Sequence, residues 1–178
     1  MLDYDPYVAL QRLRPVGTFT VASEDFEPNG PLARAQWAAH AGGADRSPQL
    51  SWTGYPPGTR SFAVTCLDPD APTASGWWHW SVANLPATVT SLDADAGAAG
   101  GAKLPSGALM LRNEDGEASF SGAAPPRSTG VHRYMFVVHA LDVPSFDLEP
   151  DASPASLGTR CFFHALARGI LVSTANRD

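Results

Sequence analysis

One short stretch of the chain, residues 68–84, gathers residue types that bind ions or move protons. Its sequence, DPDAPTASGWWHWSVAN, contains two carboxylates, three tryptophans and a histidine. A carboxylate beside an imidazole can build a metal site, an acid/base pair or a binding pocket for a small anion. Each X-Pro bond restricts the residue before it, so the two prolines stiffen the segment that carries Asp68 and Asp70. We expect a stiff loop whose carboxylates point at His79.

A second cluster follows at residues 121–134, where a loop rich in glycine and proline again runs into a strand. Its sequence is SGAAPPRSTGVHRY. His132 and Tyr134 are two residues apart, so on a strand their side chains share one face. If this strand lies near the one that begins at His79, the two histidines and the phenol converge with Asp68 beneath a proline-walled rim. Spacing alone does not place the two strands side by side.

Three kinds of chemistry stay open at these clusters. Asp68 and the two histidines could take a divalent ion, but prolines and a phenol are poor neighbours for one. An Asp–His pair with a phenol could do acid/base catalysis. Ser75 and Ser121 lie nearby, yet neither sits in a nucleophile elbow, and no cofactor motif is present. We therefore predict a binding protein rather than an enzyme, with no metal or cofactor, and keep acid/base catalysis as the alternative. His40 and His139 are interpreted as loop and sheet residues.

The composition favours one domain and argues against several classes of partner. The 178 residues fit a single domain, 1–178, and 44% are hydrophobic against 17% charged. The formal charge is −6 and Lys103 is the only lysine, so no basic patch for nucleic acid is visible. The apolar run at 135–141 is too short to span a bilayer. Because the first residues carry acids and Cys66 and Cys161 match no metal spacing, we expect a cytoplasmic protein with two buried thiols.

Short segments of strand character, separated by 16 glycines and 16 prolines, must position the two clusters. Two of them, 61–67 and 133–142, are apolar on both alternating faces, which is typical of strands buried between layers. With the segments at 18–22, 79–85, 108–112 and 170–174, they predict an all-β sandwich. Asp5-Pro6 and Ser153-Pro154 predict two helices, the second running to about Arg168 and stopped by Gly169.

In these motifs the sequence resembles the phosphatidylethanolamine-binding proteins, which include the Raf kinase inhibitor proteins. Asp68-Pro-Asp-Ala-Pro72 is similar to the first signature of the family, and Gly130-Val-His-Arg-Tyr134, preceded by two prolines, is similar to the second. His79 matches the family's histidine. The segments 47–52 (SPQLSW) and 163–167 (FHALA) resemble an upstream strand and a late helix of the bacterial branch.

This resemblance, which covers roughly residues 18–175, implies a mainly β fold: an antiparallel Greek-key β-sandwich with a few short flanking α-helices. It also implies a small pocket for an anion such as phosphate. The implied partners are a small anionic or phosphorylated ligand, a lipid headgroup included, and a regulated kinase or protease, and a homodimer is common among bacterial relatives. The residues that it places at the pocket are Asp68, Asp70, His79, Ala124, Pro125, Pro126, His132 and Tyr134. Because many relatives have glycine at position 124, we expect the methyl of Ala124 to narrow the pocket or restrict its backbone.

Histidine explains how an anion site can contain two acids. A carboxylate beside an imidazole favours the charged ring. We expect Asp68 to accept from one ring nitrogen and to leave the other N–H of His79 or His132 aimed at the ligand. Tyr134 donates its phenolic hydrogen, and Asp70 shapes the loop. Two or three such bonds predict a weak affinity for free phosphate, on the order of millimolar to micromolar.

Overall fold

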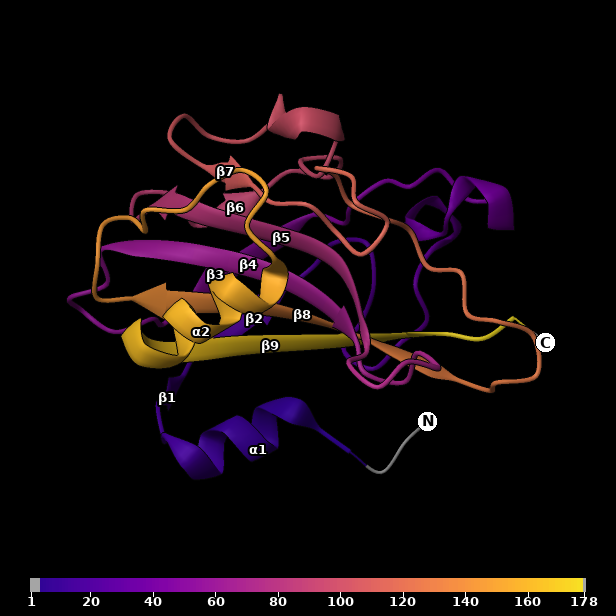
Figure 1. Ribbon diagram of the computed structural model, residues 1–178, viewed down its shortest axis with the longest axis horizontal. Coiled ribbons are helices and arrows are strands. Elements are labelled where there is room, and N and C mark those ends of the chain that lie inside the picture. The colour runs from indigo at the N-terminus through magenta and orange to yellow at the C-terminus, as the bar shows by residue number, and fades with distance from the viewer. Residues whose placement is uncertain (1–3, 178) are drawn as a thin grey trace.

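The computed structural model describes residues 4–177 and shows a mainly β protein with two sheets (Figure 1). The strands of the larger sheet are β1 (Gly17–Thr18), β4 (Ser61–Asp68), β5 (Trp77–Pro86), β7 (Leu109–Met110), β8 (His132–Leu141) and β9 (Ala165–Ala175). The strands of the smaller sheet are β2 (Thr20–Ala22), β3 (Leu50–Thr53) and β6 (Ser91–Leu92). The helices are α1 (Pro6–Leu13) and α2 (Pro154–His164), with three short 3₁₀ turns, η1 (Arg34–Gln36), η2 (Ala39–Ala41) and η3 (Ala99–Gly101).

The larger sheet runs in the order β1-β9-β8-β4-β5-β7 and the smaller in the order β2-β3-β6. Neighbouring strands are antiparallel except β1 and β9, which are parallel. The predicted mainly β class with short flanking helices is confirmed, and a Greek-key connection stays a prediction. Among residues 4–177, no helix is long and apolar enough to span a membrane.

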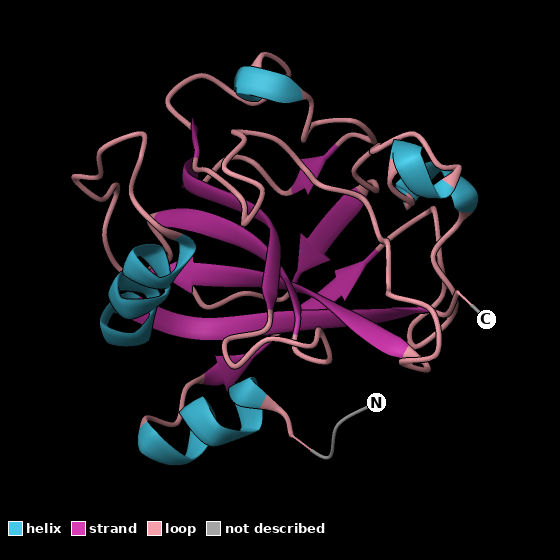
Figure 2. Ribbon diagram, turned by 45° about the vertical axis from the view of Figure 1, so that its right-hand side comes forward, coloured by secondary structure: helices cyan, strands magenta, loops and turns pink. Residues whose placement is uncertain are grey.

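The main core lies between the two sheets because each sheet turns an apolar face toward the other. Trp52 from β3 packs edge-on against Phe62 from β4, with ring centroids 5.4 Å apart. The two helices cover the opposite face of the larger sheet (Figure 2). Tyr7 of α1 belongs to one apolar cluster with Val137 of β8, and Leu157 of α2 belongs to another with Ala63 of β4. Layers on both faces explain why β4 and β8 are apolar on both alternating faces.

The prediction of two buried thiols is confirmed. Cys66 lies in the main core and Cys161 lies on the buried face of α2, and both are free. Helix α1 also begins where the sequence predicts, because the Asp5 carboxylate accepts the backbone N–H groups of Tyr7 and Val8. The predicted strand at 18–22 is divided between β1 and β2, which belong to different sheets.

The second helix is shorter than the sequence predicts. It ends at His164, and the chain enters β9 at Ala165, so Arg168 and Gly169 lie in a strand. Helix α2 ends early because of a tertiary contact: strand β9 pairs with the whole length of β8, from His132 to Leu141.

Gly169 is therefore not a helix stop but a site of close packing between the two sheets. A Cβ atom placed on Gly169 would lie 2.4 Å from the Val21 side chain and 2.9 Å from that of Phe19. Glycine is needed here because the side chains of Val21 and Phe19 pack directly against its backbone. A pattern of neighbouring residues along the chain does not reveal this contact.

Candidate functional site

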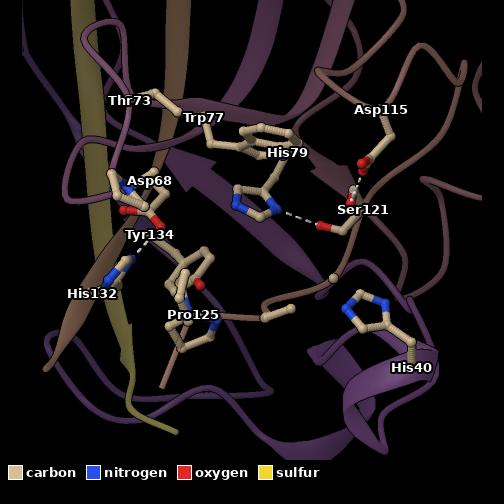
Figure 3. Close-up of a pocket in the computed structure, with 15 residues that line it drawn as sticks. His40, Asp68, Thr73, Trp77, His79, Asp115, Ser121, Pro125, His132 and Tyr134 are labelled. Carbon is tan, nitrogen blue, oxygen red and sulfur yellow. Dashed lines mark hydrogen bonds and ion pairs between the residues drawn. The ribbon is translucent and has the colours of Figure 1, made fainter. Parts of the chain in front are cut away.

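The two predicted clusters do meet, at one end of the larger sheet (Figure 3). Strand β4 ends at Asp68 and strand β8 begins at His132, and the two strands are antiparallel neighbours. The end of one therefore lies beside the start of the other. This places the loop 69–76 against the loop 121–131.

Two neighbouring acids tie these loops together. The Asp68 carboxylate lies 2.7 Å from Nδ1 of His132, and both side chains are buried. The Asp70 carboxylate accepts from Nε of Arg133 at 2.8 Å, from its Nη2 at 3.0 Å and from its backbone N–H at 2.9 Å. Asp70 thus shapes the loop as predicted, but through Arg133, and it does not line the cavity that the loops enclose.

A cavity of about 320 Å³ opens between the two loops, and we call it the rim cavity. Seven of the eight predicted site residues line it: Asp68, His79, Ala124, Pro125, Pro126, His132 and Tyr134. Eight further residues complete the lining: His40, Ala71, Pro72, Thr73, Trp77, Asp115, Ser121 and Gly122. Ala124 does not have a positive φ, so its methyl group stands in the cavity wall without backbone strain.

His132 uses both ring nitrogens within the protein. Nδ1 bonds to the Asp68 carboxylate, and Nε2 lies 2.8 Å from the hydroxyl of Thr129. That hydroxyl gives its single hydrogen to the Pro126 carbonyl at 2.7 Å, so it accepts from Nε2. Both ring nitrogens of His132 are therefore occupied by partners within the protein.

One detail of the sequence prediction is therefore wrong. Asp68 does orient a histidine, His132, but the second N–H of that ring does not point at a ligand, because Thr129 takes it. Of the two histidines, this leaves His79 as the one available to a bound group.

His79 is hydrogen-bonded through only one of its ring nitrogens within residues 4–177. Its Nδ1 lies 2.8 Å from the Ser121 carbonyl, which only accepts, so Nδ1 carries the hydrogen. Burial lowers the pKa of His79, and the Ser121 and Asp68 oxygens oppose this effect only in part. In the neutral ring Nε2 is an acceptor. Among residues 4–177 no hydrogen bond reaches this nitrogen, and Figure 3 shows the ring inside the rim cavity.

Tyr134 supplies a donor beside that ring. Its ring packs edge-on against the ring of His79, with centroids 5.0 Å apart. Burial, and next the Asp68 carboxylate, raise the pKa of the Tyr134 phenol. The phenol therefore keeps its hydrogen at any pH at which the protein would normally be studied.

Three of the residues that the sequence analysis did not assign to the site bring further polar groups. The exposed Asp115 carboxylate accepts from the Ser121 hydroxyl at 2.5 Å, and His40 stands on the short turn η2 (Figure 3). They come from loops that no periodic pattern links to the cavity. The only local signal was the position of Ser121 at the head of the second cluster.

Gly122 lets the second loop approach the chain around Trp37. A Cβ on Gly122 would lie 2.4 Å from the carbonyl carbon of Trp37 and from the backbone nitrogen of Ala38. The contact is fixed by the backbone N–H of Ala38, which donates to the Ala123 carbonyl at 3.0 Å. Close approach of two backbones is a usual reason for glycine. Here it sets the position of the wall formed by residues 124–126.

The site offers no cluster of metal ligands within the described part of the chain: no group of three or more His, Cys, Asp or Glu side chains is placed to hold an ion. The donors that face the cavity are instead suited to hydrogen bonding. Around the cavity stand the hydrogen-bonded Asp68–His132 pair, the His79 ring with its lowered pKa, the Tyr134 phenol with its raised pKa, and the Asp115 side chain.

A two-sheet β fold with this histidine-lined cavity at one end defines the class of protein. The sequence profile described as Phosphatidylethanolamine-binding protein matches residues 22–176, nearly the whole chain. The chain belongs to this family, as the two signatures predict.

Its relatives include bacterial proteins of similar size. The UPF0098 protein YbcL of Escherichia coli K12 is 53% identical over 116 residues, which are 65% of this chain and 63% of YbcL, slightly under two thirds of that relative's length. YbhB of the same organism is 49% identical over 125 residues, 70% of this chain and 78% of YbhB. The crystal structure of E. coli YbcL, described as a new member of the mammalian PEBP family, has a TM-score of 0.87 and 41% identity, covering 91% of this chain and 100% of that one.

A phosphatidylethanolamine-binding protein homologue from Chlamydia trachomatis is also similar in structure. Its TM-score is 0.76 at 27% identity, and the match covers 91% of this chain and 99% of that one. In both comparisons the structural likeness therefore covers about nine tenths of this chain.

Proposed function

We propose that the rim cavity binds a phosphate-like or carboxylate group, carried by a small ligand, a lipid headgroup or a phosphorylated partner. One observation carries this proposal. The Nε2 atom of His79 has no hydrogen-bond partner within residues 4–177, and the His79 ring packs beside the protonated phenol of Tyr134. The Tyr134 hydroxyl is already a hydrogen-bond donor, and Nε2 of His79 becomes a second donor when it takes up a proton. The proline walls limit access of water, which strengthens each bond.

Binding of an anion at this site requires a proton. The neutral His79 presents a lone pair, which repels an anionic oxygen. The bound group must therefore bring its own hydrogen, as a hydrogen phosphate does, or binding must be accompanied by protonation of His79. The nearby Asp115 carboxylate opposes a second negative charge. Together these effects favour singly charged groups and an affinity in the millimolar to micromolar range, on the order of 4–8 kcal/mol.

We propose a binding role rather than catalysis because, among the residues that line the rim cavity, no hydroxyl group is hydrogen-bonded to a histidine that could act as its base. The Ser121 hydroxyl is bonded to Asp115, while His79 contacts the Ser121 carbonyl instead of the hydroxyl. The alternative is acid/base catalysis with His79 as base and Tyr134 as acid. A turnover that is lost in both His79→Ala and Asp68→Asn, with folding intact, would establish that alternative.

The same donors can recognise a phosphorylated or acidic side chain of a kinase or protease, which is the regulatory role that we propose. We also propose a cytoplasmic location, supported by the two free and buried thiols. A homodimer is proposed as well, supported by exposed apolar side chains such as Leu13 and Phe163. Light scattering of the purified chain tests the dimer, and cell fractionation tests the location.

The binding proposal is tested by calorimetric titration with phosphate and with phosphoethanolamine. Tyr134→Phe removes only the phenolic hydroxyl, and we expect an affinity about tenfold lower, because a hydrogen bond to a charged group is worth about 1.5–3 kcal/mol. Tyr55→Phe, in the main core and outside the lining, is the matched control and should bind like the wild type. Equal affinities of the wild type, Tyr134→Phe and His79→Asn would overturn the proposal.

A further inference from the structure

A second cavity, of about 400 Å³, lies on the other face of the larger sheet, and we call it the helix cavity. Its floor is formed by strands β4, β5, β8 and β9, and its walls by helices α1 and α2, which flank these strands in Figure 1. No residue lines both cavities. The neighbouring residues Trp77 and Trp78 show the division, since Trp77 lines the rim cavity and Trp78 lines the helix cavity.

The walls of the helix cavity are largely apolar. Leu10 and Leu13 come from α1, Phe162 comes from α2, and Leu67 and Trp78 come from the sheet. The volume falls within the range of pockets that hold small organic ligands, roughly 300–1,000 Å³. Arg14, which follows α1, joins the two helices by donating to the carbonyl groups of Phe162 and Ala165 at the end of α2.

The floor of this apolar space carries a buried cation. Arg168 of β9 is 4% exposed, and its Nε and Nη1 atoms have no hydrogen-bond partner within residues 4–177. Its partner in the strand register, His139 of β8, is also 4% exposed, and its Nδ1 has no partner in the same part of the chain. Burial lowers the pKa of His139 to about 3, so this ring is neutral. No carboxylate lines the cavity.

This situation is unusual within the protein itself. The guanidinium of Arg133 is paired with Asp70, and that of Arg14 binds helix carbonyl groups. Arg168 is the more deeply buried of the two sheet arginines, yet it has neither kind of partner. Burying a charge and its donors without partners is costly, so a chain gains stability by replacing such a residue unless a ligand uses it.

We propose that the helix cavity binds an amphipathic organic acid, with its carboxylate on Arg168 and its apolar chain between α1 and α2. A guanidinium in a dry environment is well suited to a carboxylate. A single compensating negative charge matches the single buried cation, and the neutral His139 adds one further polar contact. The apolar chain covers Leu10 and Phe162, which removes more surface from water.

The test uses octanoate, with octanol as the uncharged control and acetate as the control without a chain, in calorimetric titrations of the whole chain. We expect octanoate to bind at least about tenfold more tightly than either control. Inorganic phosphate should not displace it, which separates this site from the rim cavity. Octanoate that binds no better than octanol and acetate, or an excess of phosphate that displaces it, overturns the proposal.

Two variants test whether octanoate binds at Arg168 and in the helix cavity. Arg168→Met should lose at least about tenfold in octanoate affinity while raising the melting temperature of the unliganded protein. Gly158→Phe should block binding. Gly158 lines the helix cavity and a Cβ at this position meets no atom within 4 Å, so the phenylalanine side chain has room to occupy the cavity. Gly158→Ala is the matched control and should bind normally. If Arg168→Met does not fold, Gly158→Phe still decides: binding that survives the phenylalanine contradicts the proposal.

Discussion

His79 and His132 stand in one cavity but differ in how many partners their ring nitrogens have. Both nitrogens of His132 have a partner inside the protein, Asp68 on one side and Thr129 on the other. His79 donates only to the Ser121 carbonyl, and burial keeps it neutral. The first ring holds the loops together, and the second is the one that can respond to a bound group.

The first prediction is that anion binding strengthens as the pH falls. Because the pKa of free His79 is lowered, few molecules carry the proton that an anion needs, and lowering the pH supplies it. Methyl sulfate is the suitable probe, since it carries a single negative charge and does not titrate in this range. Calorimetry in two buffers of different ionisation enthalpy should reveal proton uptake on binding. His79→Asn should abolish the pH dependence, and an affinity that rises with pH would contradict the assignment.

The second prediction concerns Asp115, whose carboxylate lies at the edge of the rim cavity. Asp115→Asn should raise the affinity for methyl sulfate by about twofold at low salt, because removing an exposed like charge is worth roughly 0.5 kcal/mol. The gain should shrink in high salt. Glu117→Gln removes an equal charge outside the rim lining and serves as the control. If both variants gain equally, the effect is one of net charge and not of the site.

At the scale of elements, the cavity exists because the end of β4 and the start of β8 are joined twice. Asp68 and Asp70, one on the strand and one beyond it, bind the neighbouring residues His132 and Arg133. The Asp68 carboxylate also accepts the backbone N–H of Asp70, which tightens the turn. These bonds connect two loops that are about sixty residues apart in the sequence.

The third prediction follows from this arrangement. Asp70→Asn leaves the Arg133 guanidinium without its buried carboxylate, and we expect the free energy of unfolding to fall by about 3 kcal/mol. Urea denaturation measures it. In the double variant with Arg133→Met the loss should be smaller than the sum of the two single losses. Glu149→Gln, which is exposed, is the control, and a loss from Asp70→Asn as small as the control's would show that the pair does not hold the loop.

At the scale of the whole molecule, two neutral buried histidines couple stability to pH. His79 lies in the rim cavity and His139 lies in the floor of the helix cavity, where it faces Arg168 and Tyr7. Burial lowers both pKa values, that of His139 to about 3 from the ordinary 6.5. Below pH 6.5 the unfolded chain therefore takes up protons that the folded chain does not.

The fourth prediction is that the protein loses stability as the pH falls from 6.5 toward 5. Each such histidine contributes a slope of up to about 1.4 kcal/mol per pH unit, because the unfolded state binds the additional proton. His139→Leu should reduce the slope by about that amount, and His40→Ala, at an exposed position, should not change it. Denaturation midpoints at several pH values provide the measurement. A slope unchanged in His139→Leu would show that this ring is not neutral in the folded protein.

The sequence by itself determined the features that depend on neighbours along the chain. Strands β4 and β8 are recognisable because their residues are apolar on both faces, and α1 because Asp5 caps it. Asp68, His79, His132 and Tyr134 stand out because they lie at or near the ends of strands, whereas the resemblance to the family added Ala124, Pro125 and Pro126. Such signals are local, and the family signatures add the long-range pairing of the two loops.

Only the tertiary structure decided which partner each polar group takes. Asp70 binds Arg133, Thr129 occupies the second nitrogen of His132, and Asp115 joins the cavity from a distant loop. The end of α2 was set by the pairing of β9 with β8, and that pairing also buried Arg168 without a partner. The physical reason is common to these cases: hydrogen bonds and burial depend on directions across contacts between distant segments, which no spacing along the chain encodes.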